Sequence, residues 1–203
     1  MNRRIHSASC YKAKGQRAVG LIEVLIAMLV LALGLLGLMR MQLAAKQAAF
    51  EAAQRTVATN LARDLLERMR SNPTQLDAYS VSELGTTSTL SAAVNCAQQS
   101  CAADQLARYD LYDWHQALLG RTAEFKLGGA AFNSAGLVEP RACVNHSAGE
   151  VSVAIAWRGT ELITAANSSD DSYASDCGTN QGLYGDADRQ RRLLVLNTYI
   201  GKP

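Results

Sequence analysis

An apolar run from Val19 to Met39 constrains this chain more than any other feature. About 20 consecutive apolar residues are enough for a helix to cross a bilayer. Its one charge is Glu23, and an unpaired carboxylate inside a bilayer costs about 2.5–3.5 kcal/mol. The run is preceded by five basic residues and no acidic residue: Arg3, Arg4, Lys12, Lys14 and Arg17. Because basic flanks stay in the cytoplasm, this pattern predicts a single membrane span with the bulk of the chain on the other side.

Two other kinds of N-terminal segment also contain a long apolar run. A secretory signal peptide fits poorly, because the run is too long and no cleavage site of small residues follows it. A plain single-pass anchor fits the length and composition, but it gives no reason for a carboxylate at Glu23. The position of this glutamate at the start of the run therefore favours a more specific interpretation.

The segment Ala18–Ala27 resembles the N-terminus of type IV pilins and pseudopilins. In that family a basic leader ends in glycine, and the mature chain then reads Phe-(Thr/Ser)-Leu-Ile-Glu-Val-Leu-(Ile/Val)-Ala. The similarity continues through Leu33–Leu38 to Gln42, as in minor pilins of the PilV type, and returns around residues 106–114 and 151–160. The resemblance implies a structural protein of a pilus.

The resemblance also implies a processing site between Ala18 and Val19, although these two residues stand where the family has glycine and phenylalanine. Prepilin peptidase would remove residues 1–18 and N-methylate the new amine of Val19. Glu23 takes the place of the glutamate that pairs with an N-terminal amine during assembly. A buried charge is tolerated when an opposite charge neutralises it. The alternative is a Glu23 side chain that reaches the membrane surface without a partner.

Four cysteines remain if the leader, which contains Cys10, is removed: Cys96, Cys101, Cys143 and Cys177. An even number outside the cytoplasm indicates disulfides, and three pairings are possible. We favour Cys96–Cys101, whose partners enclose a short polar turn, and Cys143–Cys177. A zinc site is the competing interpretation, but the chain has no Cys-x-x-Cys motif, and its histidines lack metal-ligand spacing.

Helical periodicity continues beyond the apolar run and predicts one helix from about residue 20 to residue 70. Apolar residues recur near helical spacing: Leu43, Phe50, Val57, Leu61, Leu65, Leu66 and Met69. Ser71-Asn72-Pro73 is a stop signal, because the residue before proline disfavours helix. We divide the chain into a leader (1–18), a transmembrane half-helix (19–40), an amphipathic half-helix (41–72) and a periplasmic head (73–203).

The expected fold class is α+β and type IV pilin-like, with the long helix packed on a small antiparallel sheet. A second, short amphipathic helix is predicted over residues 102–119, closed by Gly120. Strand patterns cover residues 122–127, 141–145, 150–157 and 192–200. The last strand is apolar on both faces from Leu193 to Leu196, which predicts deeper burial than for the others.

Two long polar segments separate these elements. Residues 71–100 are rich in Ser, Thr and Asn and are expected to form mostly loop, with some helical tendency near residues 90–94. Residues 159–189 read as a polar loop of a length that is uncommon in a compact domain. A disulfide from Cys177 to Cys143 is a physical reason for such a loop to persist.

The sequence contains no recognisable catalytic constellation, so we expect no enzyme, cofactor or bound metal. His115 stands alone beside Trp114 and reads as structural, and Trp157 reads as a core residue. A calcium site is disfavoured because three acidic residues lack EF-hand spacing: Asp170, Asp171 and Asp176. A short basic run without interleaved aromatic residues predicts a solvated strand edge rather than nucleic-acid binding: Arg189, Arg191 and Arg192.

These patterns lead to the hypothesis of a minor type IV pilin of the PilV kind. It would be inserted in the inner membrane with a periplasmic head and would then enter the pilus at or near its tip. The expected partners are prepilin peptidase, other minor pilins, the major pilin, the inner-membrane assembly platform and the lipid bilayer. Two alternatives stay open: a minor pseudopilin of a type II secretion system, and a membrane-anchored periplasmic binding protein or enzyme.

Overall fold

The computed structural model describes residues 20–127, 130–133, 136–163 and 175–201. The chain divides into two compact units, residues 1–45 and residues 46–203. The first unit contains the start of the long helix, and the second contains the remainder of that helix with the sheet and the second helix.

Helix α1 runs from Leu21 to Ser71. It ends where Asn72 precedes Pro73, the first residue of the short 3-10 segment η1 (Pro73–Tyr79), as expected from the restriction that proline places on its neighbour. Among the described residues, α1 is the one helix that is long and apolar enough to cross a membrane, by length and composition. In the first unit, all of its residues from Leu21 to Ala45 are exposed. The prediction of a single long helix is confirmed.

In the second unit, α1 buries one stripe of residues at helical spacing: Gln54, Ala58, Ala62, Leu65, Leu66 and Met69. Small alanines in the middle of the stripe let other elements approach the helix closely. The apolar side of this half of the helix, which is amphipathic as predicted, therefore forms part of the core of the head.

Four antiparallel strands form the main sheet in the order β1-β4-β5-β6. Their bounds are Val81–Gly85, Arg141–Ser147, Glu150–Arg158 and Arg191–Tyr199. The β4–β5 hairpin turns through Ala148 and Gly149, which both have positive φ (51° and 90°), as in a type I′ turn. The order places β5 inside the sheet and β6 at its edge.

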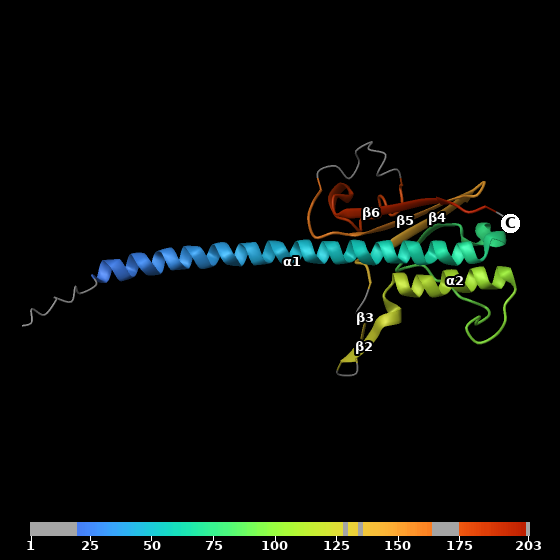
Figure 1. Ribbon diagram of the computed structural model, residues 1–203, viewed down its shortest axis with the longest axis horizontal. Helices are drawn as coiled ribbons and strands as arrows, with labels where there is room; N and C mark the ends of the chain where they lie inside the picture. Colours follow the sequence, from blue (N-terminus) through green and yellow to red (C-terminus); the bar gives the residue numbers. More distant parts are fainter. Residues whose placement is uncertain (1–19, 128–129, 134–135, 164–174, 202–203) are drawn as a thin grey trace, which may run out of the picture. The chain divides into compact units, whose positions relative to one another are not determined.

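One face of the sheet lies against the helices. Val144 from β4 and the alternating Val151, Val153 and Ile155 from β5 are buried in one core with residues of α1 and α2. Figure 1 shows the second half of α1 between the sheet and α2. Trp157 continues the same alternation and is 4% exposed, so its assignment to the core is confirmed.

Helix α2 (Ala103–Leu118) ends near the predicted boundary, and Gly120 adopts the left-handed φ of 71° that suits a residue following a helix. Trp114 is fully buried, and its Nε1 donates a hydrogen bond to the carbonyl of Leu61, 2.8 Å away. This contact holds α2 on α1 and joins two residues that are 53 positions apart in the sequence.

Two expectations for the head were wrong. The segment 71–100 contains η1 and strand β1, because β1 gains its hydrogen bonds only from β4, far along the chain. Residues 90–94 form no helix. The strand expected over residues 122–127 is confirmed as β2 (Glu124–Leu127), and it pairs with β3 (Ala130–Asn133) in a separate two-stranded sheet.

The last strand also differs from expectation, since Leu193, Leu194, Val195 and Leu196 are half-buried and β5 is the more deeply buried strand. The reason is its edge position: β6 is covered on both faces but is paired on one side, within the described part of the chain. A strand that is apolar on both faces is therefore covered on both faces, but it need not lie in the middle of the sheet.

Candidate functional site

The first turn of α1 carries Glu23. The backbone N–H groups of Glu23 and Val24 donate to the carbonyl of Gly20 at 2.9 and 3.4 Å, so the glutamate lies where the helix begins. A carboxylate at this end of a helix is favoured by the helix dipole by about 0.3–1 kcal/mol. This local effect stabilises the negative charge, but it does not replace a cationic partner inside a bilayer.

Glu23 lies at one end of an exposed face of the helix that also carries Val24, Ala27, Met28 and Leu31. These positions recur at helical spacing and therefore share one side of α1. The face is apolar except for the carboxylate at its N-terminal end. It can therefore pack against lipid tails or another apolar helix, while one oxygen-bearing group at its end is available to a cation.

Two glycines follow on the same exposed helix. An added Cβ at Gly34 or Gly37 would meet no heavy atom within 4 Å in the described structure. The absence of side chains there lowers helix propensity by about 1 kcal/mol per residue and allows a neighbouring helix to approach closely.

The predicted cleavage and methylation residues, Ala18 and Val19, lie outside the described residues.

The head contains an anchored carboxylate that sequence reasoning missed. Glu51 of α1 accepts hydrogen bonds from Arg192 of β6 through Nε and Nη2, at 3.0 Å each, and from the N–H and Oγ1 of Thr160, at 2.8 Å each. Burial works to raise the pKa of Glu51, but the hydrogen bonds from Arg192 and Thr160 outweigh it and lower the pKa to about 2. A lone glutamate on an amphipathic helix gave no signal of this role.

A second polar cluster joins α1 to α2. Arg68 pairs with Asp113 at 2.9 Å, with Asp64 at 3.0 Å and with Asp110 at 3.5 Å. The hydroxyl of buried Tyr79 donates to Asp110 at 2.7 Å, and burial together with this carboxylate raises the pKa of Tyr79. These contacts hold η1 and the two helices together.

The structure joins Cys96 to Cys101 and Cys143 to Cys177, the pairs favoured from the sequence. Cys143 lies on β4, and the second disulfide packs on the outer face of the sheet against Ala154, Leu193 and Val195. The disulfide holds the segment that precedes β6 against this part of the outer face.

The basic run at the start of β6 is solvated only at Arg189, which is exposed, so the expectation of a solvated edge is wrong for Arg191 and Arg192. Arg191 is 4% exposed, and its Nη1 donates to the carbonyls of Ser175 and Cys177 at 3.0 Å each. Arg192 is committed to Glu51. Arg191 therefore holds the segment that contains Cys177, and Arg192 holds α1.

His115 is buried in the head, and its Nε2 lies 3.0 Å from the carbonyl oxygen of Gly85. Burial lowers its pKa, and no partner of Nδ1 lies within the described residues. Within that part of the chain, no three His, Cys, Asp or Glu side chains are grouped to hold a metal ion. Asp170 and Asp171, considered for calcium, lie outside it.

Two family models match adjoining parts of this chain. Residues 13–39 match the prokaryotic N-terminal methylation motif, and residues 40–112 match the family described as type IV pilin Tt1218. No curated protein and no solved structure gives a significant match. The first matched region includes Glu23 and the apolar run, and the second continues along α1 into α2. Together with the long apolar helix and the small antiparallel sheet, the two matches support a type IV pilin, without distinguishing the PilV kind.

Proposed function

We propose that this chain is a minor type IV pilin of the PilV kind, which primes pilus assembly and is incorporated at or near the tip. Residues 19–40 anchor it in the inner membrane before assembly, and the head faces the periplasm. The observation that carries the proposal is the single carboxylate of Glu23 at the end of an exposed apolar helix face, within the matched methylation motif.

The proposed mechanism begins with prepilin peptidase, which cleaves between Ala18 and Val19 and methylates the new amine. The amine is positively charged and the Glu23 carboxylate is negative. In an apolar filament core each charge would be costly alone, and each is neutralised when the amine of one subunit meets Glu23 of its neighbour. The apolar face beside Glu23 then packs on neighbouring helices as it leaves the lipid.

A Glu23→Ala variant tests this mechanism. We expect the variant to insert in the membrane as the wild type does and to lose most of its association with other pilins. Insertion is measured by resistance to alkaline carbonate extraction, and association by cross-linking followed by co-purification. Met39→Ala is the matched control, because Met39 is an exposed apolar residue of the same apolar run that lies outside the face beside Glu23.

The results separate the alternatives. Association of Glu23→Ala with other pilins at the wild-type level would contradict the proposal. Co-purification of the wild type with components of a type II secretion system, in place of pilus subunits, would favour a minor pseudopilin. Capture of neither set of partners would point to a membrane-anchored binding protein or enzyme.

A further inference from the structure

The outer face of the sheet is divided into two halves. Around Cys143 and Ala154 it is covered by the disulfide to Cys177. Beyond them the face opens into a hollow of about 570 Å³, formed by the ends of β4, β5 and β6. This volume lies within the range of about 300–1,000 Å³ that is typical of small-molecule sites.

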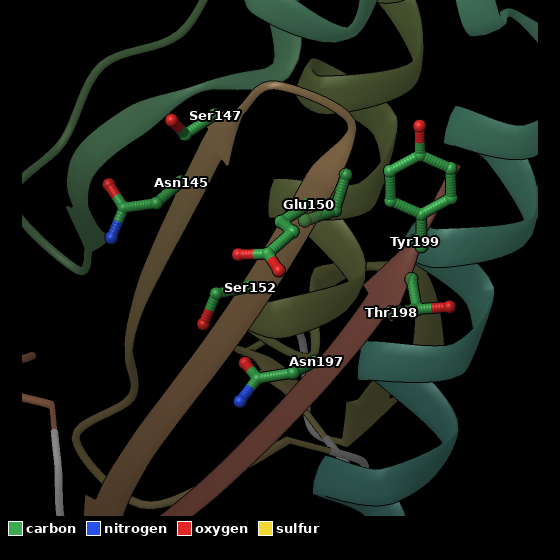
Figure 2. Close-up of a pocket in the computed structure, with 8 residues that line it drawn as sticks. Asn145, Ser147, Glu150, Ser152, Asn197, Thr198 and Tyr199 are labelled. Carbon is green, nitrogen blue, oxygen red and sulfur yellow. The ribbon is translucent and has the colours of Figure 1, made fainter. Parts of the chain in front are cut away.

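The side chains in the open half are regularly arranged. Asn145, Ser152 and Asn197 are register partners across the three strands, and Ser147, Glu150 and Tyr199 form the next row two residues along. Since alternate residues of a strand share a face, both rows project on the same side. Figure 2 shows these side chains around the hollow, with Tyr199 at the end of β6.

Most of this lining can both donate and accept hydrogen bonds. Each asparagine amide supplies two donors and an acceptor oxygen, and each hydroxyl supplies a donor and acceptor sites. Among the described residues, no side-chain hydrogen bond engages Asn145, Ser152 or Asn197, and the side chains of Asn145 and Asn197 are exposed. Glu150 contributes the one charge among the residues that line the hollow.

Tyr199 adds an aromatic surface at the rim. It is 69% exposed, and its ring lies across Gly149 of the hairpin turn. A Cβ at Gly149 would come within 2.7 Å of the tyrosine ring, so the glycine allows the ring to lie there. A rigid aromatic ring beside uncharged amides and hydroxyls presents both an apolar and a hydrogen-bonding surface to one ligand.

We propose that this hollow is a binding site for a neutral oligosaccharide. A sugar ring has an apolar C–H face, which would stack on Tyr199, and hydroxyl groups, which would exchange hydrogen bonds with Asn145, Ser152 and Asn197. The carboxylate of Glu150 accepts from hydroxyls but repels acidic sugars, so the site discriminates against uronic acids. The inference is independent of the pilin role, since it needs neither cleavage nor assembly.

Saturation-transfer NMR on the full chain tests the inference. The protein is kept in lauryldimethylamine oxide micelles, because this detergent carries no sugar, and it is probed with maltohexaose, cellohexaose and hexa-N-acetylchitohexaose. We expect transfer from irradiated aromatic protons to at least one of these neutral probes. An acidic probe, oligogalacturonate, should show weaker transfer, and Glu150→Gln should remove the difference.

Tyr199→Ala should weaken binding by about tenfold, the effect of losing an aromatic contact at the upper end of the usual range. Leu162→Ala is the matched control, because Leu162 is 58% exposed and lies outside the hollow. Near-ultraviolet circular dichroism checks that both variants keep the wild-type fold. Three outcomes would overturn the inference: no transfer to any neutral probe, unchanged transfer in Tyr199→Ala, or stronger transfer to the acidic probe.

Discussion

The carboxylate of Glu51 and the guanidinium of Arg192 form a bidentate ion pair, with Arg192 Nε and Nη2 each 3.0 Å from a carboxylate oxygen. The pair joins α1 to the edge strand β6 across 141 residues of sequence. The same carboxylate holds the N–H and hydroxyl of Thr160, just after β5. One side chain of the long helix therefore fixes two separate parts of the head.

Replacing Glu51 with Gln should lower the free energy of unfolding of the head by about 1.5–3 kcal/mol, the usual contribution of hydrogen bonds to a charged group. Near-ultraviolet circular dichroism of the detergent-solubilised chain, followed during urea unfolding, measures the change. Glu67→Gln is the control: its side chain is 66% exposed, and an exposed pair with Arg70 contributes at most about 1 kcal/mol. Equal losses in the two variants would contradict a special role for Glu51.

The same ion pair predicts an acid dependence. The pKa of Glu51 is lowered from 4.5 to about 2, so folding favours the charged carboxylate. Its contribution is complete above pH 4.5 and is lost as the pH falls toward 2, because the unfolded chain takes up the proton first. Unfolding midpoints of the wild type should therefore fall more steeply over this window than those of Glu51→Gln. Parallel pH profiles would show that Glu51 does not cause the difference.

His115 predicts a separate effect at milder pH. Burial lowers its pKa from 6.5, more than the hydrogen bond to the Gly85 carbonyl raises it, and the charge of Arg121 lowers it further. The folded state thus favours the neutral ring, and its contribution to stability is lost as the pH falls below 6.5 through the lower folded value. Stability measured at pH 7 and pH 5 should differ less in His115→Gln than in the wild type. An unchanged difference would assign the effect to other groups.

Removing the Cys143–Cys177 disulfide by a double alanine substitution should lower head stability by up to about 4 kcal/mol, in the chain-entropy description of cross-links. The shorter Cys96–Cys101 link should contribute about 2 kcal/mol on the same basis. Alkylation before digestion, followed by mass spectrometry, should find no free thiol among these four cysteines in the mature protein. A Cys96–Cys143 peptide would show a different pairing.

Processing should occur between Ala18 and Val19, and the methyl group of Ala18 should slow it relative to glycine at the same position. Ala18→Gly is therefore expected to raise the ratio of mature to precursor chain in pulse-labelled cells. N-terminal sequencing of membrane-extracted protein identifies the cleaved bond. A mature protein that begins elsewhere would leave Glu23 at a different distance from the amine and would weaken the proposed pairing.

Local patterns in the sequence determined the long helix, its end before Pro73, the second helix and three strands of the main sheet. The physical reason is that helical spacing, a proline stop and alternation over β5 act between neighbouring residues. Glu23 was also recognisable from its place in the apolar run, because an acid in such a run is costly wherever the rest of the chain lies.

Tertiary structure alone decided the features that depend on distant partners. Strand β1 exists through its pairing with β4, and β6 lies at the edge although its residues are apolar on both faces. Arg192 became an internal ion-pair partner only when β6 came beside α1 and Glu51. The row of Asn145, Ser152 and Asn197 likewise depends on the strand register, which brings together residues from distant parts of the chain by hydrogen bonds that no local pattern encodes.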